Sequence, residues 1–498
     1  MMQRSSLLVF TLVFLCALAL YASTAAPSLT WAHDGTDGGD LITAAVTNGV
    51  PHPPGYPTYV TLGQVIAQIP IGEVAQRFNL FSALCMSLAT GFTALSILLF
   101  LPSTTVRFVN ESVAIVASLF FVAAPMVWGQ ATIAEVHALN ACLVALIVYL
   151  IAPIVFRGKA VSIRRMMLAA WLWGIAFGNS PTVAALAPLM IVAWWRGASL
   201  RLAERVHNSL YKSLPIIASL IGLSVYALIP LRAAQQPPIN WGDATSFDRF
   251  IALITAEMYR GYALGTPPAD LLTRLIALAQ LIVAQYGWLG VILGTVGVYY
   301  ALVSPNRNWR WLAITIAFYL LFALTYSAAD SALYLIPVWM FGAWAIAREL
   351  LALIQYAVRI TRHASIVLLL VCLFGPVLNL LIYFPSMNLR DDQSATEFTR
   401  AVLSTAPAGA IIITENDGQT FALWYHRHIA GQRPDLAIVD RRLAGYPWYD
   451  AMLHAQGSAP TLPEYDPSGT WVDRLAELNP GRPLCIVDRE SARMSCQP

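Results

Sequence analysis

The stretch Asp34-Gly-Thr-Asp-Gly-Gly-Asp40, followed closely by His52-Pro-Pro-Gly-Tyr-Pro57, places three carboxylates and a histidine in a short region after the first apolar segment. Elsewhere charge is sparse, since only 11% of the 498 residues are charged. Glycines beside the acids let the backbone turn tightly and let a substrate come close. A carboxylate at a membrane surface is suited to be the general base of a glycosyl-transfer or hydrolysis step.

The acidic loop leads into residues 41–46, which predict a short helix. Asp37 or Asp40 would lie in its first turn, where the helix dipole favours an anion and keeps a carboxylate ionised. The alternative is that these aspartates only cap the helix. The loop by itself leaves both interpretations open.

The composition predicts a polytopic membrane protein. Hydrophobic residues make up 58% of the chain, and the charged fraction of 11% is far below the roughly 25% of soluble domains. The net charge is +3 and there are only two lysines, Lys159 and Lys212. No polybasic tail is present, so we expect no nucleic-acid partner.

The six cysteines have no metal-type spacing. Four lie in apolar runs, where they are expected to pack as small hydrophobic residues: Cys16, Cys85, Cys142 and Cys372. Cys485 and Cys496 fall in the polar tail and could form a disulfide if that tail is extracytoplasmic. The aspartates of the first loop fit no calcium-binding pattern, so we expect no metal ion.

Eleven apolar segments are candidates for membrane spans, each of which needs about 20 apolar residues. They lie near 5–25, 79–101, 112–128, 133–156, 165–179, 181–196, 213–231, 285–304, 309–327, 332–354 and 365–384. The first could be a cleaved signal peptide, but its long apolar core favours a retained helix. Asn179-Ser-Pro181 divides one run into two short pieces.

Lysine and arginine residues indicate the orientation, because cytoplasmic loops carry an excess of them. With the N-terminus inside, thirteen fall in inner loops: Arg107, Arg157, Lys159, Arg164, Arg165, Arg196, Arg201, Arg205, Lys212, Arg307, Arg310, Arg359 and Arg362. The outer regions 26–78 and 232–270 hold four, namely Arg77, Arg232, Arg249 and Arg260. This bias places the acidic loop, the loop 232–284 and the tail after residue 384 outside.

The tail, residues 385–498, changes character and predicts a small α/β domain beside the membrane domain of residues 1–384. Residues 410–414, 436–440 and 484–488 predict strands, and Gln419 to Ile429 predicts a helix capped by Asp417. Strands alternating with helices are typical of a parallel sheet.

Several sequence motifs occur in a fixed order along the chain. Asp37-Gly-Gly-Asp-Leu41 and Asn48-Gly-Val-Pro-His-Pro-Pro-Gly-Tyr-Pro57 resemble the signature of a family of polytopic membrane glycosyltransferases that includes the animal transmembrane protein O-mannosyltransferase. The family's usual pattern is Asp-Ser-Gly-Glu before His-Pro-Pro-Gly-Tyr-Pro. Asp40 therefore stands where glutamate is usual, which shortens one carboxylate arm.

Three later stretches also resemble this family, in the expected order. They are Pro238–Asp243 with Tyr259–Tyr262, Asp330–Pro337, and Asn416–Tyr425 with Arg433–Val439. The resemblance implies the GT-C type of membrane fold and a polyprenyl-phosphate sugar as donor substrate, with no other cofactor. It also implies an essential acidic residue in the first outer loop.

With that resemblance, we expect Asp37 to be the catalytic base and Asp40 its catalytic neighbour. Asp34 matches no family position and is interpreted as loop solvation. Within the His-Pro-Pro-Gly-Tyr-Pro block, we expect His52 and Tyr56 to bind substrate. For His52 the alternative is a histidine held only by the proline-rich turn.

Other polar residues are expected near the same cavity. Arg260, beside Tyr259, is the candidate cation for the lipid phosphate, against the alternative of a surface arginine stacked on tyrosines. Glu135 and Asp330 fall at outer helix ends and are expected to bind substrate. Arg232, and with it Arg77, is expected to extend to the membrane interface.

The function expected from the sequence is transfer of a sugar, mannose by family analogy, to a hydroxyl of a protein or glycan acceptor outside the membrane. We expect the inner, or plasma, membrane of a bacterium. A transporter or flippase for a lipid-linked glycan is the alternative. It is disfavoured because transporters place ionisable residues at the bilayer midplane, whereas these acids cluster at outer helix ends.

Overall fold

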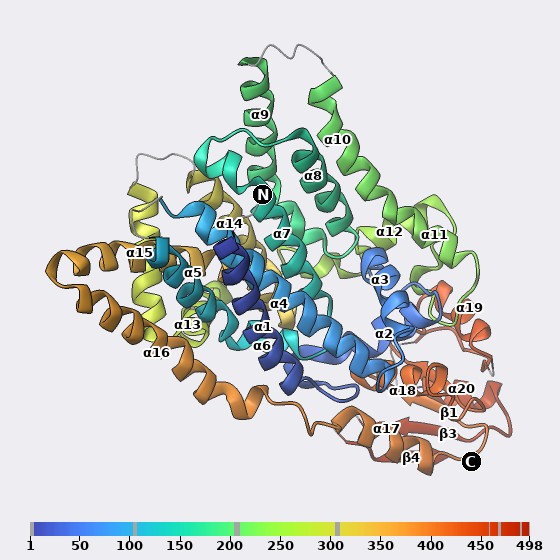
Figure 1. Cartoon of the computed structure of the whole chain (residues 1–498). Helices are drawn as coiled ribbons and strands as arrows, with labels where there is room; N and C mark the ends of the chain where they lie inside the picture. The colour runs from blue at the N-terminus through green and yellow to red at the C-terminus, as the bar shows by residue number, and fades with distance from the viewer. Residues whose placement is uncertain are drawn as a thin grey trace.

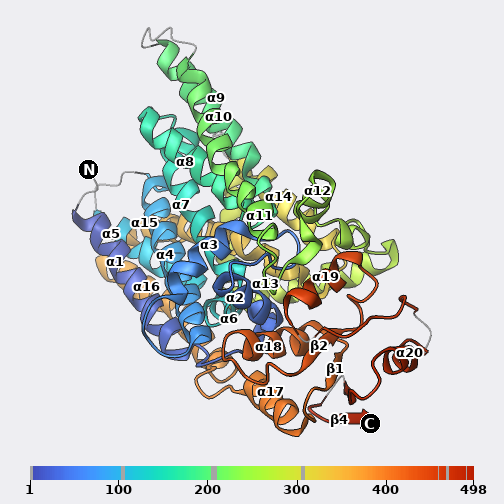
Figure 2. The ribbon, with the colours of Figure 1, turned by 90° about the vertical axis from the view of Figure 1, so that its right-hand side faces the viewer.

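The computed structural model describes residues 4–102, 107–203, 210–303, 309–457, 459–466, 470–488 and 491–497. It has a body of long helices with a small α/β tail at one end (Figure 1). Figure 2 shows the tail, coloured orange to red, gathered at the end opposite the projecting tips of α9 and α10.

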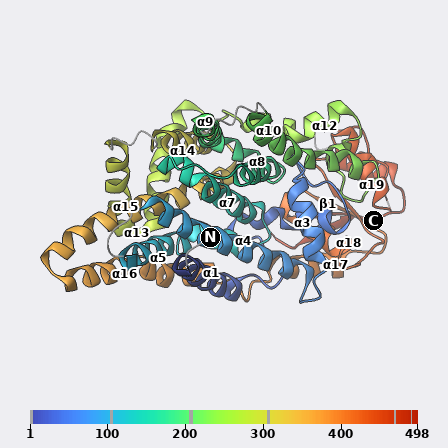
Figure 3. The ribbon, with the colours of Figure 1, turned by 45° about the horizontal axis from the view of Figure 1, so that its top comes forward.

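The helical body alternates long helices with short ones in the loops. Its first half contains α1 (Arg4–Thr24), α2 (Gly38–Val46), α3 (Pro57–Ala67), α4 (Val74–Phe100), α5 (Arg107–Val122), α6 (Pro125–Ala131), α7 (Val136–Arg157), α8 (Ile163–Phe177) and α9 (Ala187–Ala203). Its second half contains α10 (Leu210–Leu223), α11 (Leu228–Ala233), α12 (Phe247–Ile254), α13 (Leu271–Val303), α14 (Trp309–Thr325), α15 (Ile336–Ile360) and α16 (Arg362–Met387). Figure 3 shows α4 and α7 between α1 on one side and α8 and α10 on the other.

The described residues contain seven helices long and apolar enough to cross a membrane, or eight if α5 and α6, bent by 71° at their break, form one span. A multi-span membrane protein is therefore confirmed. Within the described residues each of the eleven predicted segments is mainly helical, although 112–128 covers both α5 and α6. The helices α8, α9 and α14 have only 15, 17 and 17 residues. The count of eleven spans stays a prediction.

Hydrogen bonds join loops that the distribution of lysine and arginine places on the same side of the membrane. Among the segments predicted outside, the Ala26 amide donates to the Thr132 carbonyl at 3.1 Å, and the Thr58 amide donates to the Gly178 carbonyl at 2.9 Å. At the other end, Arg165 Nε donates to the Leu150 carbonyl at 2.8 Å. The chain thus alternates between two ends of the body. Of the thirteen inner cations, Arg205 and Arg307 lie outside the described residues.

This alternation makes the orientation testable. Reporter domains placed after Gly158 and after Arg390 should report opposite compartments, with Gly158 in the cytoplasm, because cations concentrate in the loops on that side. Alkaline phosphatase and green fluorescent protein activities of the two fusions give the measurement. The same compartment for both positions would contradict the predicted topology.

The tail contains a four-stranded sheet in the order β2-β1-β3-β4, from β1 (Ile411–Thr414), β2 (Ala437–Asp440), β3 (Leu484–Val487) and β4 (Met494–Gln497). The first three strands are parallel, as predicted, whereas the antiparallel β4 was not predicted. The tail helices are α17 (Ser394–Thr405), α18 (Asp417–His428), α19 (Pro447–Ala455) and α20 (Trp471–Leu478).

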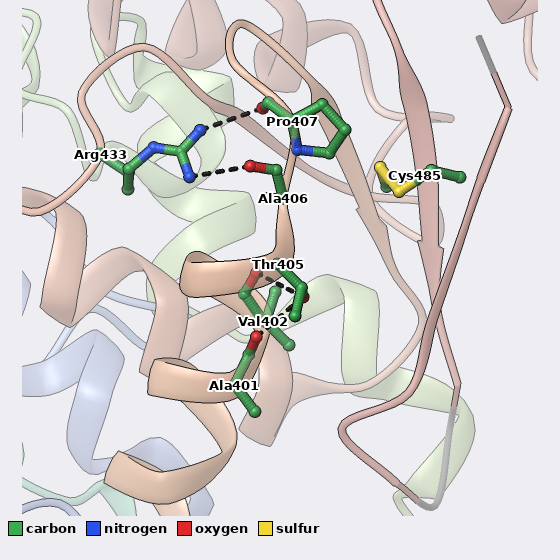
Figure 4. The surroundings of a disulfide bond; sticks show 8 residues. Ala401, Val402, Thr405, Ala406, Pro407, Arg433 and Cys485 are labelled. Carbon is green, nitrogen blue, oxygen red and sulfur yellow. Dashed lines mark hydrogen bonds between the residues drawn. A yellow bond between two sulfur atoms is a disulfide. The ribbon is translucent and has the colours of Figure 1, made fainter.

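Two side-chain interactions secure the tail (Figure 4). Cys485 on β3 and Cys496 on β4 are register partners and form a disulfide, as considered from the sequence. Arg433 donates to the carbonyls of Ala406 and Pro407 after α17, at 2.9 and 3.0 Å. The predicted cap of α18 was wrong by one residue, because Asn416 Oδ1 accepts from the Gln419 amide.

The tail packs directly on the acidic loop. A Cβ atom added at Gly39 in α2 would lie 2.4 Å from the Phe421 carbonyl oxygen in α18, so only glycine permits this approach. The Tyr425 hydroxyl accepts from the Ala75 amide at 3.1 Å, which joins α18 to α4. Trp241 of the second outer loop belongs to the same apolar core as the tail sheet.

Gly39→Ala should therefore destabilise the protein by about 1–3 kcal/mol, the usual effect of overpacking, although alanine is the better helix former by about 1 kcal/mol. Thermal unfolding of the detergent-purified protein gives the measurement. Gly261→Ala is the matched control, since a Cβ there meets nothing within 4 Å. Equal midpoints for wild type and Gly39→Ala would show that α2 and α18 do not pack this closely.

Candidate active site

The acidic loop forms a short 3-10 turn, η1 (Ala32–Asp37), before α2 begins. His33 and Asp34 adopt the left-handed backbone conformation, with φ of 56° and 63°. Asp34 is exposed, in agreement with loop solvation. Asp37 occupies the N-cap position of α2, but its side chain makes no capping hydrogen bond. The capping interpretation is therefore wrong for Asp37, and its carboxylate remains available for other interactions.

Asp40 lies one turn further on and is fully buried, with an exposed fraction of 0%. Its Oδ2 accepts hydrogen bonds from the His52 amide at 2.9 Å and from His52 Nδ1 at 2.7 Å. Its Oδ1 accepts from Trp241 Nε1 at 3.0 Å. Three donors thus compensate the buried charge, and Asp40 has no surface that a substrate could reach.

Backbone pairing brings the second outer loop to this position. The Val50 amide donates to the Ile239 carbonyl at 2.8 Å, and the Trp241 amide donates to the Val50 carbonyl at 3.0 Å. These bonds set Trp241 beside Asp40 although the two residues are 201 positions apart. Trp241 belongs to a motif of the second outer loop, but no local pattern predicts a role for it at the site.

His52 connects the two aspartates. Its Nε2 lies 3.4 Å from Asp37 Oδ2, on the opposite side of the ring from Asp40. The ring stacks on Phe421, with centroids 6.3 Å apart and planes at 12°, and contacts the edge of Tyr56 at 5.0 Å. Phe421 comes from the tail helix α18, and no local pattern in the sequence predicts it as a site residue.

The charges of this group are set by their neighbours. Burial alone would lower the pKa of His52, but Asp37 and the hydrogen-bonded Asp40 raise it to about 10. Burial raises the pKa of Asp37, and the positive charge of His52 lowers it. The negative charges of Asp417, Asp40 and Asp330 raise the pKa further, and the net result is a value of about 6. At neutral pH His52 is therefore protonated and Asp37 is largely ionised. About 35% of the Asp37 side chain is exposed, so its carboxylate is accessible, unlike that of Asp40.

Several other predicted residues surround Asp37. Glu135 is buried at the start of α7, where Oε2 accepts from the Val136 amide at 3.2 Å, whereas Oε1 has no hydrogen-bond partner among the described residues. Burial and the charge of Asp37 raise the pKa of Tyr259 well above its usual value. Asp330 is near enough to act on the pKa of Asp37.

The three arginines predicted on the outer side, Arg260, Arg232 and Arg77, differ in exposure and in hydrogen-bond partners. Arg260 has 65% of its side chain exposed and forms an ion pair with Glu257 at 3.0 Å. In the described part of the chain, no ion pair joins Arg260 to Asp37 or Asp40. Arg232 was predicted to reach the interface, which is wrong, because it is buried and donates to Asn48 and Thr61. Arg77 donates to carbonyls at the end of α3, including that of Ala67.

Within the described residues, no group of three or more histidine, cysteine, aspartate or glutamate side chains is placed to hold a metal ion. The carboxylates of Asp37 and Asp40 both face His52 instead. The expectation that no metal assists stays a prediction.

Two regions of the chain match domain models of a known protein family. Residues 37–201 match the family described as the protein O-mannosyl-transferase TMEM260 N-terminal domain, and residues 395–466 match TMEM260-associated domain 2. The resemblance to the TMEM260 family is confirmed. Asp37 and the His-Pro-Pro-Gly-Tyr-Pro block fall within the first matched region.

Two relatives of the TMEM260 family are 25% identical to the chain. The protein O-mannosyl-transferase tmem260 of Dictyostelium discoideum matches over 345 residues, covering 65% of this chain and 40% of the relative. TMEM260 of Mus musculus matches over 460 residues, covering 87% of this chain and 63% of the relative. The chain thus spans less than two thirds of the length of each.

Solved structures show the same fold at low identity. ArnT from Cupriavidus metallidurans bound to undecaprenyl phosphate has a TM-score of 0.59 and 13% identity, covering 98% of this chain and 97% of that one. The oligosaccharyltransferase AglB from Archaeoglobus fulgidus, in complex with an inhibitory peptide and a dolichol-phosphate, has a TM-score of 0.53 and 12% identity, covering 97% and 69%. The expected GT-C type of membrane fold is confirmed.

Proposed function

We propose that this chain is a membrane glycosyltransferase that moves a sugar from a polyprenyl-phosphate donor to a hydroxyl of a protein acceptor on the extracytoplasmic side. The single observation that carries the proposal is the Asp37 carboxylate, which is partly exposed, makes no capping hydrogen bond and lies beside the His52 imidazolium. Mannose is the proposed sugar, after the names of the relatives, and the inner membrane of a bacterium the proposed location. The Cys485–Cys496 disulfide supports an oxidising compartment for the tail.

In the proposed reaction Asp37 is the general base. The acceptor oxygen forms a bond to C1 of the sugar while the bond between C1 and the phosphate oxygen breaks. The acceptor proton passes to Asp37, and polyprenyl phosphate leaves with the bonding electron pair. The transition state resembles an oxocarbenium ion, as in glycoside hydrolysis.

Asp40 acts through His52 rather than on the substrate. It accepts one hydrogen bond from the ring nitrogen Nδ1 of His52 and one from the His52 backbone amide, so that Nε2 stays directed at Asp37. The positive charge lowers the pKa of Asp37 and keeps the base ionised near neutral pH. Trp241 fixes the second oxygen of Asp40, and Phe421 and Tyr56 confine the ring.

The donor is proposed to lie among the remaining residues around Asp37. Tyr56, Tyr259 and Asp330 are near enough to Asp37 for their charges to influence one another, and the Tyr56 ring contacts His52. Glu135 has a carboxylate oxygen without a partner among the described residues. Arg260 is proposed to bind the lipid phosphate. Its exposed pair with Glu257 is worth only about 0–1 kcal/mol, so a phosphate can replace that carboxylate.

The alternative of a transporter or flippase is supported by no feature of this site. Asp37, Asp40 and Glu135 gather at one end of the helical body, next to the tail, rather than halfway along broken helices. An assay of the purified protein in vesicles distinguishes the two functions by whether the lipid-linked sugar is consumed. A transferase consumes polyprenyl-phosphate sugar, whereas a flippase only moves it.

Asp37→Asn should lower turnover by about 10²- to 10⁴-fold, the usual contribution of a placed general base, while leaving donor binding nearly unchanged. A transfer assay with purified variants and undecaprenyl-phosphate mannose gives the measurement. Asp34→Asn is the matched control, since Asp34 is exposed on the same loop. Full activity of Asp37→Asn would exclude Asp37 as the base.

The pH dependence provides a second test. Because the base must be deprotonated, kcat/KM should fall as the pH drops through about 6, the pKa of Asp37. His52→Gln should move this acid limb to higher pH, because it removes the positive charge that lowers the pKa of Asp37. An acid limb that stays in place or moves to lower pH in His52→Gln would contradict the assigned ion pair.

A further inference from the structure

The tail contains a pocket next to helix α19 (Figure 2). Its volume is about 680 Å³, within the range of roughly 300–1,000 Å³ that is typical of small-molecule sites. The loop after β2, part of α19 and the segment 459–465 form its walls. The polar and aromatic side chains that line it are Tyr446, Asp450, His454, Thr461, Glu464 and Tyr465. Asp37, Asp40 and His52 are not among the lining residues, so this pocket is separate from the candidate active site.

Hydrogen bonds fix the backbone on two sides of the pocket. The Asn479 side chain, after α20, accepts from the Thr461 amide at 2.8 Å and donates to the Thr461 carbonyl at 2.9 Å. These two bonds hold the segment 459–465 in place. At the end of α19, Gln456 Nε2 donates to the Pro238 carbonyl at 2.8 Å, which joins this wall to the second outer loop. The pocket is therefore a built feature of the tail.

Two exposed tyrosines distinguish this pocket from the rest of the tail surface. Among the described residues after α16, the exposed large hydrophobic side chains are Tyr446, Tyr465 and Leu478, and both tyrosines line the pocket. The Tyr446 ring stacks on Trp448, with centroids 5.7 Å apart and planes at 29°. The Tyr465 ring packs on the loop after β2, since a Cβ atom at Gly445 would lie 3.2 Å from it. Exposed aromatic rings that meet in one concave place are typical of a binding surface.

The polar groups of the pocket indicate the chemistry of its ligand. The hydroxyls of Tyr446, Tyr465 and Thr461 both donate and accept, whereas the ionised carboxylates of Asp450 and Glu464 only accept. No lysine or arginine occurs among the described residues that line the pocket, so a phosphate or carboxylate ligand would find no cation there. A neutral sugar has the complementary groups, namely hydroxyls for the polar side chains and a face of C–H groups for the aromatic rings.

We infer that this pocket binds a neutral glycan, with the C–H face of a sugar ring on the tyrosine rings and sugar hydroxyls donating to Asp450 and Glu464. The inference goes beyond the proposed transfer reaction, because binding here breaks no bond and needs no donor lipid. A cationic ligand would use the rings and the carboxylates but would leave the tyrosine and Thr461 hydroxyls without a role. Since the tail packs on the acidic loop, a glycan bound here is held at the same end of the molecule as Asp37.

The test is a titration of the purified full chain with mannotetraose, cellotetraose and N-acetylchitotetraose, in a detergent without a sugar head group and without donor lipid. Saturation-transfer NMR and calorimetry give the Kd, and the wild type should bind at least one of the three. Tyr465→Ala should raise that Kd about two- to tenfold, the usual value of one aromatic contact. Tyr465→Trp keeps an aromatic face and should bind like wild type. Leu478→Ala is the matched control, because it removes the other exposed hydrophobic side chain of the tail and should leave the Kd unchanged.

A second variant tests the carboxylates with little change of volume. Glu464→Gln should raise the Kd for the same oligosaccharide about two- to tenfold, because a hydrogen bond to a charged acceptor becomes one to a neutral acceptor. Glu477→Gln, exposed on α20, is its matched control and should leave the Kd unchanged. Thermal unfolding midpoints equal to that of wild type show that the variants are folded.

Three results would overturn the inference: a wild type that binds none of the three oligosaccharides, Tyr465→Ala and Glu464→Gln variants that both bind like wild type, or a pocket that binds tetralysine in place of sugar. The last result would assign the pocket to a cationic ligand. Because no donor is present, each outcome is independent of whether Asp37 is the catalytic base. Failure of the transfer assay with intact oligosaccharide binding would contradict the proposed function alone.

Discussion

The structure of the site depends on the buried carboxylate of Asp40. A fully buried charge is costly unless it is paired and hydrogen-bonded. Here the compensation comes from three different segments: α2 carries the carboxylate, the proline-rich turn supplies His52, and the second outer loop supplies Trp241. Removing any one of them would leave a buried polar group without a partner. The network therefore fixes the relative position of both outer loops.

The same network gives the two aspartates different properties. Asp40 is buried and can only position His52, to whose Nδ1 it is bonded. Asp37 is partly exposed and lies beside the other ring nitrogen of His52, Nε2. Burial and neighbouring acids raise the pKa of Asp37 to about 6, while His52 opposes that effect. Two carboxylates three residues apart thus receive separate roles from their surroundings.

The tail is part of the site rather than an appendage. Gly39 allows the backbone of α18 to approach α2, which brings Phe421 onto the His52 ring and Asp417 near Asp37. The apolar core of the tail sheet also continues into the second outer loop through Trp241. The outer loops and the tail therefore build the site together.

The sequence by itself determined the elements with a local pattern: the apolar runs that became helices, the short strands of the tail, and the acidic loop that holds Asp37 and Asp40. These depend on burial along a continuous stretch of chain. Tertiary structure alone decided which partners meet, because Trp241 and Phe421 reach Asp40 and His52 from 201 and 369 positions away. It also decided that Asp37 caps nothing, that Arg232 is buried and that a polar strand, β4, completes the sheet. Such contacts arise from packing between distant segments, and no local periodicity records them.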